Sequence, residues 1–251
     1  MLAAPNAPLC HASTLKEGQT FSFGEAIAHG LRFREINVKE AFTVVDAEGV
    51  FFRASLKRLE EGGGEAVAYE RMSGSTESPA RITLVCAVLG RQRMIQVVQK
   101  ATELGVVRVV PVLSDKSVQP KDLDHEKPWA WPGQALKGAK QSRRASVPEV
   151  TKTMPLAKAI AAPFWTGAGA RFVLDDRAPA GVDPFAPLGT GDGIDVVLAI
   201  GPEGGWSDAE RAKLGEAGAR ALALGVRVLR AETAVFAGLA VLQHRLGDLR
   251  A

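Results

Sequence analysis

Residues 196–206, VVLAIGPEGGW, constrain the fold of this chain more than any other part of its sequence. The first five residues are all apolar, which is typical of a strand buried on both faces of a parallel sheet. Three glycines within residues 201–205 then interrupt the strand, and they allow main-chain N–H groups to face a ligand. Ser207 and Glu210 follow with the spacing of a capping box, so a helix is expected to begin here. A strand, a glycine loop and a helix in this order predict a small-molecule site in an α/β protein.

A second apolar segment with a glycine loop lies at residues 222–234, LALGVRVLRAETA. Arg227, Arg230 and Glu232 lie close together in it, and a structural turn rarely needs so many charges. Neither loop has the spacing of the dinucleotide-binding or triphosphate-binding glycine motifs. The two loops therefore favour a ligand site of another kind, with tight structural turns as the alternative.

The composition is that of an ordinary globular protein, because 46% of the 251 residues are hydrophobic and 24% are charged. This length predicts one large domain or two of modest size. No apolar run approaches the ~20 residues of a membrane-spanning helix, and the first ten residues lack a basic leader region. We therefore expect a cytoplasmic protein without a membrane partner. The two cysteines and four histidines are scattered, so no metal site is expected.

Positive charge is concentrated in residues 136–152, where five basic residues accompany one acidic residue. The formal charge of the whole chain, +3, is too small to indicate nucleic-acid binding by itself. A local basic cluster beside a small-molecule loop nevertheless favours a polyanionic partner such as RNA, with a solvated helix end as the alternative. The basic residues are Lys137, Lys140, Arg143, Arg144 and Lys152.

Residues 1 to about 78 contain β-rich segments separated by turn sequences, and they predict a small β-barrel with one short helix at 24–32. Residues 72–79, MSGSTESP, have the composition of a linker. The expected strands are 21–23, 41–45, 50–54 and 65–69.

From residue 81 onward the pattern changes to that of an α/β domain. A buried strand at 82–88 precedes a helix that ends near Gly105, and a second strand follows at 106–113. Strand, helix and strand in this order form the unit of a parallel sheet. Small residues over much of the last helix indicate close packing on two sides, with a second subunit as one candidate partner. The remaining expected elements are a loop at 122–132, a helix at 134–144, a strand at 171–176, a connection to residue 193 and a helix at 233–246.

Several separated motifs resemble, in the same order, the RsmE family of small-subunit ribosomal RNA methyltransferases. These enzymes place a methyl group on N3 of a uridine in 16S rRNA. The motifs are KATELGVVRVVPV (100–112), QSRRASVPEV (141–150), LAIGPEGGWSDAE (198–210), LGVRVLRAETA (224–234) and LQHRLGDL (242–249). Residues 31–56 resemble the PUA-like barrel of the same family, more weakly than these motifs match.

The resemblance implies an α/β fold of the SPOUT type, in which the last strands and helix form a deep trefoil knot that holds S-adenosylmethionine. Knots are otherwise almost absent from proteins, and no periodicity in this sequence indicates one. The implied domains are a PUA-like, RNA-binding barrel at 1–75 and the methyltransferase domain at 79–251. The resemblance also implies ribosomal RNA as partner and a homodimer with the active site at the subunit boundary.

The resemblance also assigns residues to the site. Main-chain groups of the two glycine loops would form two walls around the cofactor, with a further contact from the strand at 171–176. The implied cofactor-binding residues are Leu174, Ile200, Gly201, Glu203, Gly204, Gly205, Leu224, Gly225, Val228, Leu229, Arg230 and Ala234. The residues that we expect to bind RNA are Arg93, Lys140, Arg143 and Arg144, with a solvated surface as the alternative for Arg143 and Arg144.

Uracil N3 carries a proton that must leave as the methyl group arrives, and the developing charge spreads onto the ring oxygens. Arg230 is the implied catalytic residue that stabilises this charge or anchors the nearby phosphate. Glu232, the second implied catalytic residue, or Glu203 would accept the proton or position Arg230 and the cofactor. An ion pair between Arg230 and Glu232 is the alternative, and His244 is expected to be a surface residue.

The sequence departs from the family pattern at a few positions. Lys140 and Arg144 stand where an acidic residue and a glycine are usual, Val226 replaces a proline and Ala231 a threonine. Residues 89–93 also differ from the family's lysine-glycine-aspartate pattern. Three alternatives therefore stay open: methylation of a different RNA uridine, a non-catalytic RNA-binding protein of the same fold, and an unrelated nucleotide-binding α/β domain.

Overall fold

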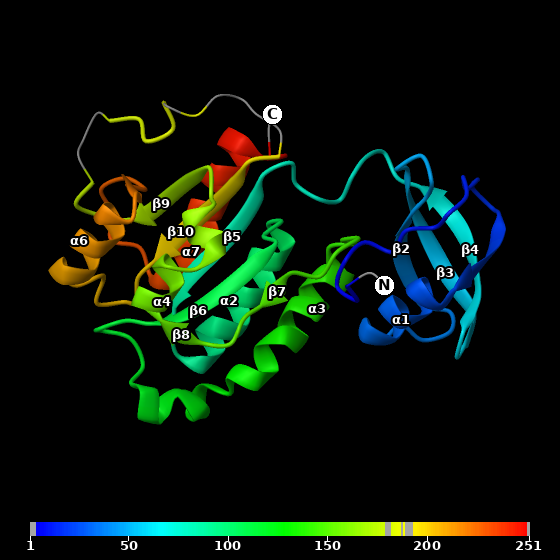
Figure 1. Cartoon of the computed structure of the whole chain (residues 1–251), viewed down its shortest axis with the longest axis horizontal. Coiled ribbons are helices and arrows are strands. Elements are labelled where there is room, and N and C mark those ends of the chain that lie inside the picture. Colours follow the sequence, from blue (N-terminus) through cyan, green and yellow to red (C-terminus); the bar gives the residue numbers. More distant parts are fainter. Residues whose placement is uncertain (1–3, 179–181, 187, 189–192, 250–251) are drawn as a thin grey trace. The chain divides into compact units, whose positions relative to one another are not determined.

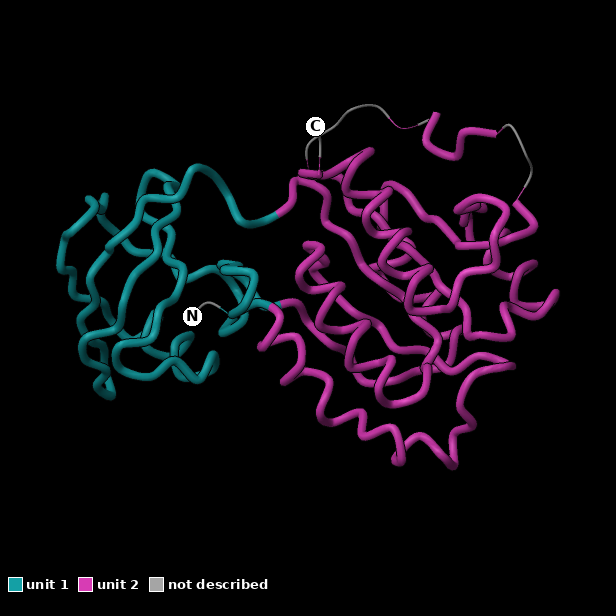
Figure 2. The backbone as a smooth tube through the Cα atoms, turned by 180° about the vertical axis from the view of Figure 1, so that it is seen from behind, with its two compact units in different colours: residues 1–77, 139–147 teal, residues 78–138, 148–251 magenta. Residues whose placement is uncertain are grey.

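The computed structural model describes residues 4–178, 182–186, 188 and 193–249 (Figure 1). The chain divides into two compact units, coloured separately in Figure 2. The small unit comprises residues 1–77 and 139–147, and the large unit comprises residues 78–138 and 148–251. The segment 139–147, which the sequence predicted as part of the second domain, thus packs with the first.

The small unit is built on a four-stranded antiparallel sheet in the order β1-β4-β3-β2. Apolar side chains from these strands and from a nine-residue helix form one core. The helix has its buried residues at helical spacing, as its sequence predicted. The elements are β1 (Thr20–Gly24), α1 (Glu25–Phe33), β2 (Ala41–Val45), β3 (Phe51–Glu60) and β4 (Gly63–Arg71).

The buried guanidinium of Arg34 connects the segment 139–147 to the rest of the small unit. It donates hydrogen bonds to main-chain oxygens of Pro5 at 2.6 Å, Ala7 at 2.7 Å and Ala145 at 2.9 Å. Burial lowers the pKa of Arg34 to about 10, although the charge of Glu77 opposes the shift. The side chain remains protonated at neutral pH, so a charged group holds three separate segments together through neutral acceptors.

The large unit contains a seven-stranded sheet in the order β11-β9-β10-β5-β6-β7, with β8 also paired to β6. All of its pairings are parallel, as the strand–helix–strand pattern predicted. The strands are β5 (Arg81–Ala87), β6 (Arg108–Leu113), β7 (Glu149–Val150), β8 (Met154–Pro155), β9 (Ala170–Leu174), β10 (Asp195–Ile200) and β11 (Arg220–Leu222).

Helices cover both faces of this sheet (Figure 1). On one face α7 packs against α2 and β10, so that Gly238 of α7 lies against Leu174 and Leu198. On the other face Val197 and Ala199 of β10 share a core with residues of α4, α5 and α6. The helices are α2 (Arg91–Glu103), α3 (Trp131–Gln141), α4 (Leu156–Ile160), α5 (Pro163–Thr166), α6 (Asp208–Glu216) and α7 (Ala231–Leu246).

The apolar segment that ends in the first glycine loop is therefore the buried strand that its sequence predicted. Strand β10 lies between β9 and β5 and is covered on both faces. The capping box that begins α6 is also confirmed: Ser207 Oγ accepts from the N–H of Glu210 at 3.2 Å, and Glu210 Oε2 accepts from the N–H of Ser207 at 2.9 Å.

Other boundaries differ from the predictions. Two short 3₁₀ helices (Pro120–Glu126 and Pro128–Ala130) overlap the expected loop at 122–132, and α3 begins three residues earlier than expected, at Trp131. Helix α7 begins at Ala231, two residues before the expected start. None of the helices in the described ranges combines the length and the apolar character that crossing a bilayer requires.

Candidate ligand site between two glycine loops

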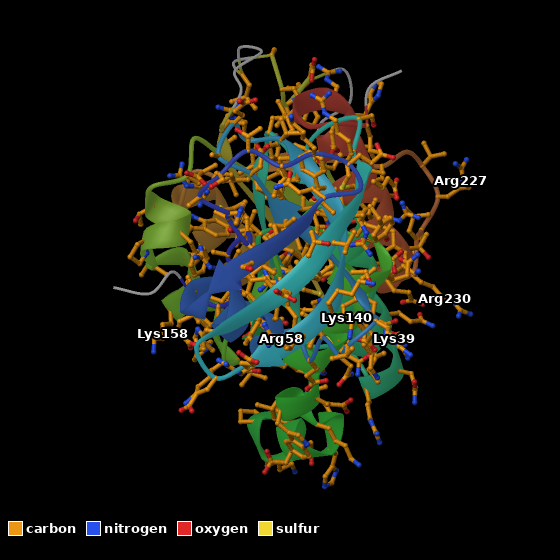
Figure 3. The ribbon with its side chains drawn as sticks, turned by 90° about the vertical axis from the view of Figure 1, so that its right-hand side faces the viewer. Lys39, Arg58, Lys140, Lys158, Arg227 and Arg230 are labelled. Carbon is orange, nitrogen blue, oxygen red and sulfur yellow. The ribbon has the colours of Figure 1, made fainter. Side chains whose placement is uncertain are left out.

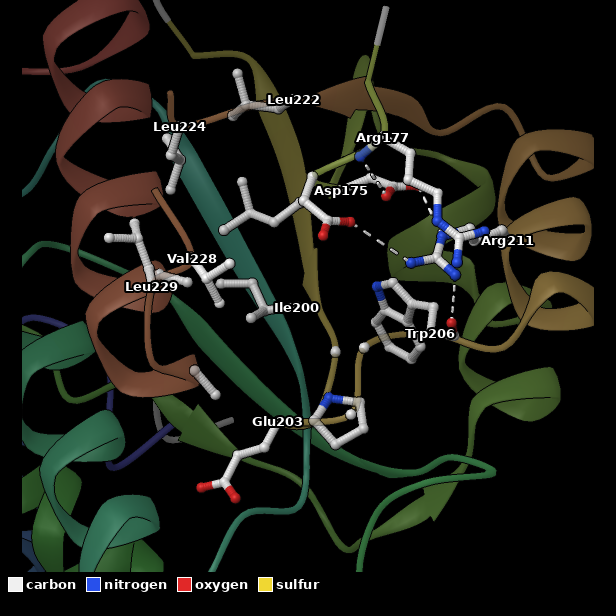
Figure 4. Close-up of a pocket in the computed structure, with 18 of the residues that line it drawn as sticks. Asp175, Arg177, Ile200, Glu203, Trp206, Arg211, Leu222, Leu224, Val228 and Leu229 are labelled. Atoms are coloured by element: carbon white, nitrogen blue, oxygen red, sulfur yellow. Dashed lines mark hydrogen bonds and ion pairs between the residues drawn. The ribbon is translucent and has the colours of Figure 1, made fainter. Parts of the chain in front are cut away.

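A cavity of about 280 Å³ lies at the carboxyl ends of β9, β10 and β11 (Figure 4). This volume is just below the roughly 300–1,000 Å³ typical of small-molecule pockets. Both glycine loops line it, as their sequences predicted. The predicted contacts that line this cavity are Leu174, Ile200, Gly201, Glu203, Gly204, Gly205, Leu224, Gly225, Val228, Leu229 and Ala234.

The first glycine loop (residues 201–205) is folded tightly against buried neighbours. A Cβ on Gly201 would lie 3.2 Å from the indole ring of Trp206, which is itself almost fully buried. Gly205 has φ +65°, in the region that favours glycine. The loop after β6 contacts the chain just beyond the first glycine loop, because Asp115 Oδ2 accepts a hydrogen bond from Ser207 Oγ at 2.5 Å. The main chain of this loop thus lies close to the Trp206 indole, and the hydrogen bond between Asp115 and Ser207 lies directly after it.

The second glycine loop (residues 223–230) is much more exposed. Gly225 has φ +89°, and the side chains of Val226 and Val228 are almost wholly exposed. Arg227 and Arg230 point outward from this loop (Figure 3), and neither forms an ion pair with another described residue. The loop therefore offers two uncompensated cations and two apolar side chains beside the cavity.

One wall of the cavity is polar, and the sequence did not predict it. Asp175 directly follows β9, and its Oδ2 accepts a hydrogen bond from Arg211 Nε at 3.0 Å. Both side chains are largely buried, with 11% and 19% exposed. Arg211 also donates to the main-chain oxygen of Trp206 at 2.5 Å. The position of Asp175 at the end of a predicted strand was a signal for this wall, but nothing local indicated its partner.

A second hollow adjoins the cavity and is lined by Arg93, Glu203, Val228, Leu229, Arg230 and Ala231. Arg93 of α2 forms an ion pair with Glu203 of the first glycine loop. Arg230, predicted as a cofactor contact, lines this hollow and not the cavity. Glu203, Val228, Leu229 and Ala231 line both spaces. The two spaces therefore share a boundary, and Arg93 and Arg230 line the second hollow but not the cavity.

Two further candidate residues lie in α7. Glu232, in its first turn, lines neither space, and its buried Oε2 has no hydrogen-bond partner among the described residues. The alternative ion pair between Arg230 and Glu232 is not formed in the described part of the chain. His244 is exposed, with its Nδ1 3.0 Å from the main-chain oxygen of Leu249, which is the surface position expected for it.

Two of the basic residues predicted to bind RNA are exposed in the small unit. Lys140 Nζ lies 3.4 Å from a carboxylate oxygen of Glu40, and Arg143 Nη1 lies 3.4 Å from Glu70. Arg143 also has φ +59°, a backbone conformation that is costly for a residue with a side chain. Both cations are accessible to a polyanion.

Arg144 lies elsewhere than the prediction required, because it is buried with 2% of its side chain exposed. Its Nη2 lies 2.5 Å from Glu77 Oε2, and it also donates to Ser146 Oγ at 3.1 Å. Burial alone would raise the pKa of Glu77, but the hydrogen bonds and charge of Arg144, with the donors of Ser146, hold it below its usual range. Arg144 thus forms a structural ion pair with Glu77 within the small unit. Its buried guanidinium cannot reach an RNA phosphate, so the predicted RNA contact is wrong.

The described residues contain no group of three or more histidine, cysteine, aspartate or glutamate side chains placed to hold a metal ion. Of the two thiols, Cys86 is fully buried in β5, and this burial raises its pKa to about 12. The polar chemistry of the site is therefore that of guanidinium, ammonium and carboxylate groups.

Comparisons with known proteins connect this site to a family. The family model of the RNA methyltransferase domain matches residues 76–243. The ribosomal RNA small subunit methyltransferase E of Aquifex aeolicus is 29% identical over 231 residues, covering 92% of this chain and 93% of that protein. The Bacillus subtilis protein of the same name is 23% identical, covering 94% of each chain.

Solved structures agree with these matches. The ribosomal RNA small subunit methyltransferase E of Neisseria gonorrhoeae, solved with S-adenosylmethionine, is 28% identical with a TM-score of 0.66, covering 97% of this chain and 100% of that one. A putative methyltransferase of Legionella pneumophila, also solved with the cofactor, is 27% identical with a TM-score of 0.64, covering 96% and 98%. The RsmE resemblance of the sequence is thereby confirmed. Since the family model matches more than half of its residues, the chain belongs to the RNA methyltransferase domain family.

Proposed function

We propose that this protein transfers a methyl group from S-adenosylmethionine to N3 of a uridine in 16S ribosomal RNA. The observation that carries the proposal is the cavity that both glycine loops line at the carboxyl ends of three parallel strands. Ligands of open α/β sheets bind at this edge. The relatives named ribosomal RNA small subunit methyltransferase E support the choice of substrate.

The residues of the cavity fit the proposed cofactor. Leu174, Leu224 and Leu229 supply an apolar part suited to adenine, and the glycine loops bring main-chain groups close to its edge. Asp175 and Arg211 supply a polar wall suited to a ribose or an amino acid. When bound, S-adenosylmethionine supplies a methyl group on a sulfonium, which is reactive enough for direct in-line transfer. The protein has to orient the reactants and complement the developing charge.

The second hollow is the proposed place of the uracil base. Arg230 lines it without an ion-pair partner among the described residues, so its guanidinium is free to complement charge on the ring oxygens or to hold a phosphate. Val228 and Leu229 offer apolar contact to the base face. Of the two candidate proton acceptors, Glu203 lies in the hollow but is engaged by Arg93, whereas Glu232 keeps an oxygen without a described partner. We assign proton acceptance to Glu232, after a small movement of its side chain.

We further propose that Lys140 and Arg143 of the small unit, together with Arg93, contact the RNA backbone. The small unit would be the PUA-like barrel that the resemblance implies, and antiparallel strands in the order β1-β4-β3-β2 support this. A trefoil knot would pass through the glycine loops, which is compatible with β10 in the middle of the sheet and α7 packed over it. Half-buried Ala237, Ala240 and Val241 of α7 support a homodimer, and the proposed substrate supports a cytoplasmic location.

The test uses small ribosomal subunits and deproteinised 16S rRNA from a strain that lacks the gene. The purified protein and S-adenosylmethionine are added, and the RNA is digested and analysed by mass spectrometry. The proposal expects one N3-methyluridine to appear in the RNA, and the same nucleotide to be unmethylated before treatment. A methyl group on another RNA would select the first alternative, and cofactor-independent RNA binding without any transfer would select the second.

A further inference from the structure

Lys116 lies across the first glycine loop at the edge of the cavity, and no sequence pattern indicated a role for it. It belongs to the loop that follows β6, and its Nζ donates a hydrogen bond to the main-chain oxygen of Gly204 at 2.9 Å. Its aliphatic part also lies over this residue, because a Cβ added to Gly204 would be 3.1 Å from Lys116 Cδ. Lys116 is also one of the residues that line the cavity. A cation is thus held in place at the mouth of the proposed cofactor site.

Lys116 differs from most of the other cationic residues of the cavity in having no acidic partner among the described residues. Arg211 forms an ion pair with Asp175, and Arg177 donates a hydrogen bond to Asp208 Oδ1 at 2.8 Å. Lys116 has a main-chain oxygen as its acceptor and forms no ion pair with a described residue. An ammonium group has three donors, so two remain available to a ligand. Its positive charge is therefore not neutralised by any acidic side chain of the described cavity.

The remaining cation of the cavity, Arg227, is a weaker candidate. It lies on the exposed second loop, and no described side chain holds its guanidinium in one orientation. A long side chain that is free to move loses rotamer entropy when it binds, and this reduces its contribution to affinity. Lys116 has already lost part of that freedom through its contacts with Gly204.

The position along the loop indicates which part of the ligand Lys116 meets. Glu203 lies on the boundary between the cavity and the second hollow, where the methyl group must face the uracil base. Gly204 is the next residue, and Lys116 lies on it. The amino-acid arm of S-adenosylmethionine is attached to the same sulfur as the methyl group, by a short aliphatic chain. If the methyl group faces the second hollow at that boundary, the carboxylate at the end of the arm would extend toward Lys116.

We propose that Lys116 binds the carboxylate of the amino-acid portion of S-adenosylmethionine through its ammonium group. The inference rests on the proposed function, whose cofactor it concerns. A charge-assisted hydrogen bond of this kind favours S-adenosylmethionine and S-adenosylhomocysteine over nucleosides that lack the amino acid. Lys116 is accordingly a specificity-determining residue of the cofactor site.

The test compares two ligands by isothermal titration calorimetry. S-adenosylhomocysteine carries the amino-acid portion, whereas 5′-methylthioadenosine shares the thionucleoside and lacks it. Lys116→Met removes the charge and keeps an aliphatic chain over Gly204. We expect this variant to bind S-adenosylhomocysteine ~10- to 100-fold more weakly than the wild type. Its affinity for 5′-methylthioadenosine should stay within about twofold.

The matched control is Lys158→Met, since Lys158 of α4 is exposed and does not line the cavity (Figure 3). It should bind both ligands as the wild type does. Equal losses for both ligands in Lys116→Met would overturn the inference, because they would mean that the lysine merely shapes the loop. Unchanged binding of S-adenosylhomocysteine would overturn it too, as would a selective loss found in Arg227→Ala instead. A wild-type protein that binds neither ligand would refute the proposed function itself, and that result is distinguishable from the others.

Discussion

Arg211 Nε lies 3.0 Å from Asp175 Oδ2, and this contact joins the start of α6 to the end of β9 across the wall of the cavity. The same guanidinium donates to the main-chain oxygen of Trp206, where the first glycine loop ends. One side chain thus connects three segments that surround the proposed cofactor. The shape of the cavity therefore depends on this arginine, although Arg211 does not line the second hollow where the uracil base is proposed to bind.

Arg211→Ala should therefore weaken cofactor binding and also destabilise the protein. It leaves the largely buried carboxylate of Asp175 without its charged partner, at a cost of about 1–3 kcal/mol. The measurements are the urea midpoint of unfolding and the affinity for S-adenosylmethionine. Arg177→Ala is the comparison for stability, because its ion pair with Asp208 is exposed and contributes less than ~1 kcal/mol. Equal destabilisation by both variants would contradict the role given to Arg211.

Gly225→Ala should deform the second glycine loop. Gly225 has φ +89° and open space where a Cβ would lie, so the cost of about 1–2 kcal/mol arises from the backbone and not from a clash. Binding of S-adenosylmethionine should fall by ~10-fold, since the loop must move to relieve the strain. Gly215→Ala is the matched control: it lies in α6 with open space around it and should stabilise the helix by ~0.5–1 kcal/mol. An unaltered affinity in Gly225→Ala would show that the loop does not need this conformation.

The Glu77–Arg144 ion pair predicts a pH dependence of stability. The pKa of Glu77 is lower in the folded protein than its ordinary value of 4.5, so the folded state favours the charged carboxylate. Its stabilising contribution is fully present above pH ~4.5 and is lost as the pH falls through the lowered folded-state pKa. Unfolding free energies measured between pH 7 and pH 3 should decrease in this acid range.

Glu77→Gln should remove this part of the acid dependence. It should also cost about 3 kcal/mol at pH 7, because it leaves the buried guanidinium of Arg144 without a carboxylate. Glu70→Gln is a suitable comparison, since the ion pair of Glu70 with Arg143 is exposed. If Glu77→Gln kept the acid dependence of the wild type, other carboxylates would have to be responsible for it.

Arg143 has φ +59°, and this strain can be measured by two substitutions at one position. Both Arg143→Ala and Arg143→Gly remove the exposed ion pair with Glu70, which contributes little. Glycine alone relieves the left-handed conformation, so Arg143→Gly should be about 1 kcal/mol more stable than Arg143→Ala. Both should bind RNA more weakly and with a shallower salt dependence if the side chain contacts a phosphate. Equal stabilities would mean that the backbone at this position relaxes without cost.

Arg230→Ala separates binding from transfer. Arg230 lines the second hollow and not the cavity, so the variant should bind S-adenosylmethionine within about twofold of the wild type. Methylation of small-subunit RNA should fall by ~100-fold or more, the usual effect of removing a group that complements transition-state charge. Loss of cofactor binding to the same extent would place Arg230 in the cofactor site instead.

The parts of the fold that the sequence predicted well are those coded by local patterns. The apolar run of β10 and the capping box of α6 each occupy consecutive residues, and hydrophobic periodicity or cap spacing identifies them directly. The two-residue strands β7 and β8 are too short to show such periodicity, because each pairs with β6 at only two positions. These two strands exist only because their residues pair with β6, and no pattern in the local sequence indicates them.

The parts of the site that were missed depend on contacts distant in the sequence. Arg211 and Asp175 are 36 residues apart, and they meet because β9 and β10 are neighbours in the sheet. Arg144 was predicted to face RNA because it lies in a basic cluster. Its burial follows from Glu77, which is 67 residues away and belongs to the predicted linker. Counting charged residues along the sequence identifies a basic cluster, but the tertiary structure decides which acidic side chain each basic residue contacts.

The central claim is that the cavity between the two glycine loops binds S-adenosylmethionine, and isothermal titration calorimetry of the wild-type protein tests it most directly. The structure predicts saturable binding at one site per chain, weakened in Gly225→Ala and unchanged in Gly215→Ala. No binding at cofactor concentrations up to about 1 mM, where free energies weaker than about −4 kcal/mol go undetected, would contradict the account. Binding that both glycine variants leave unchanged would contradict it as well.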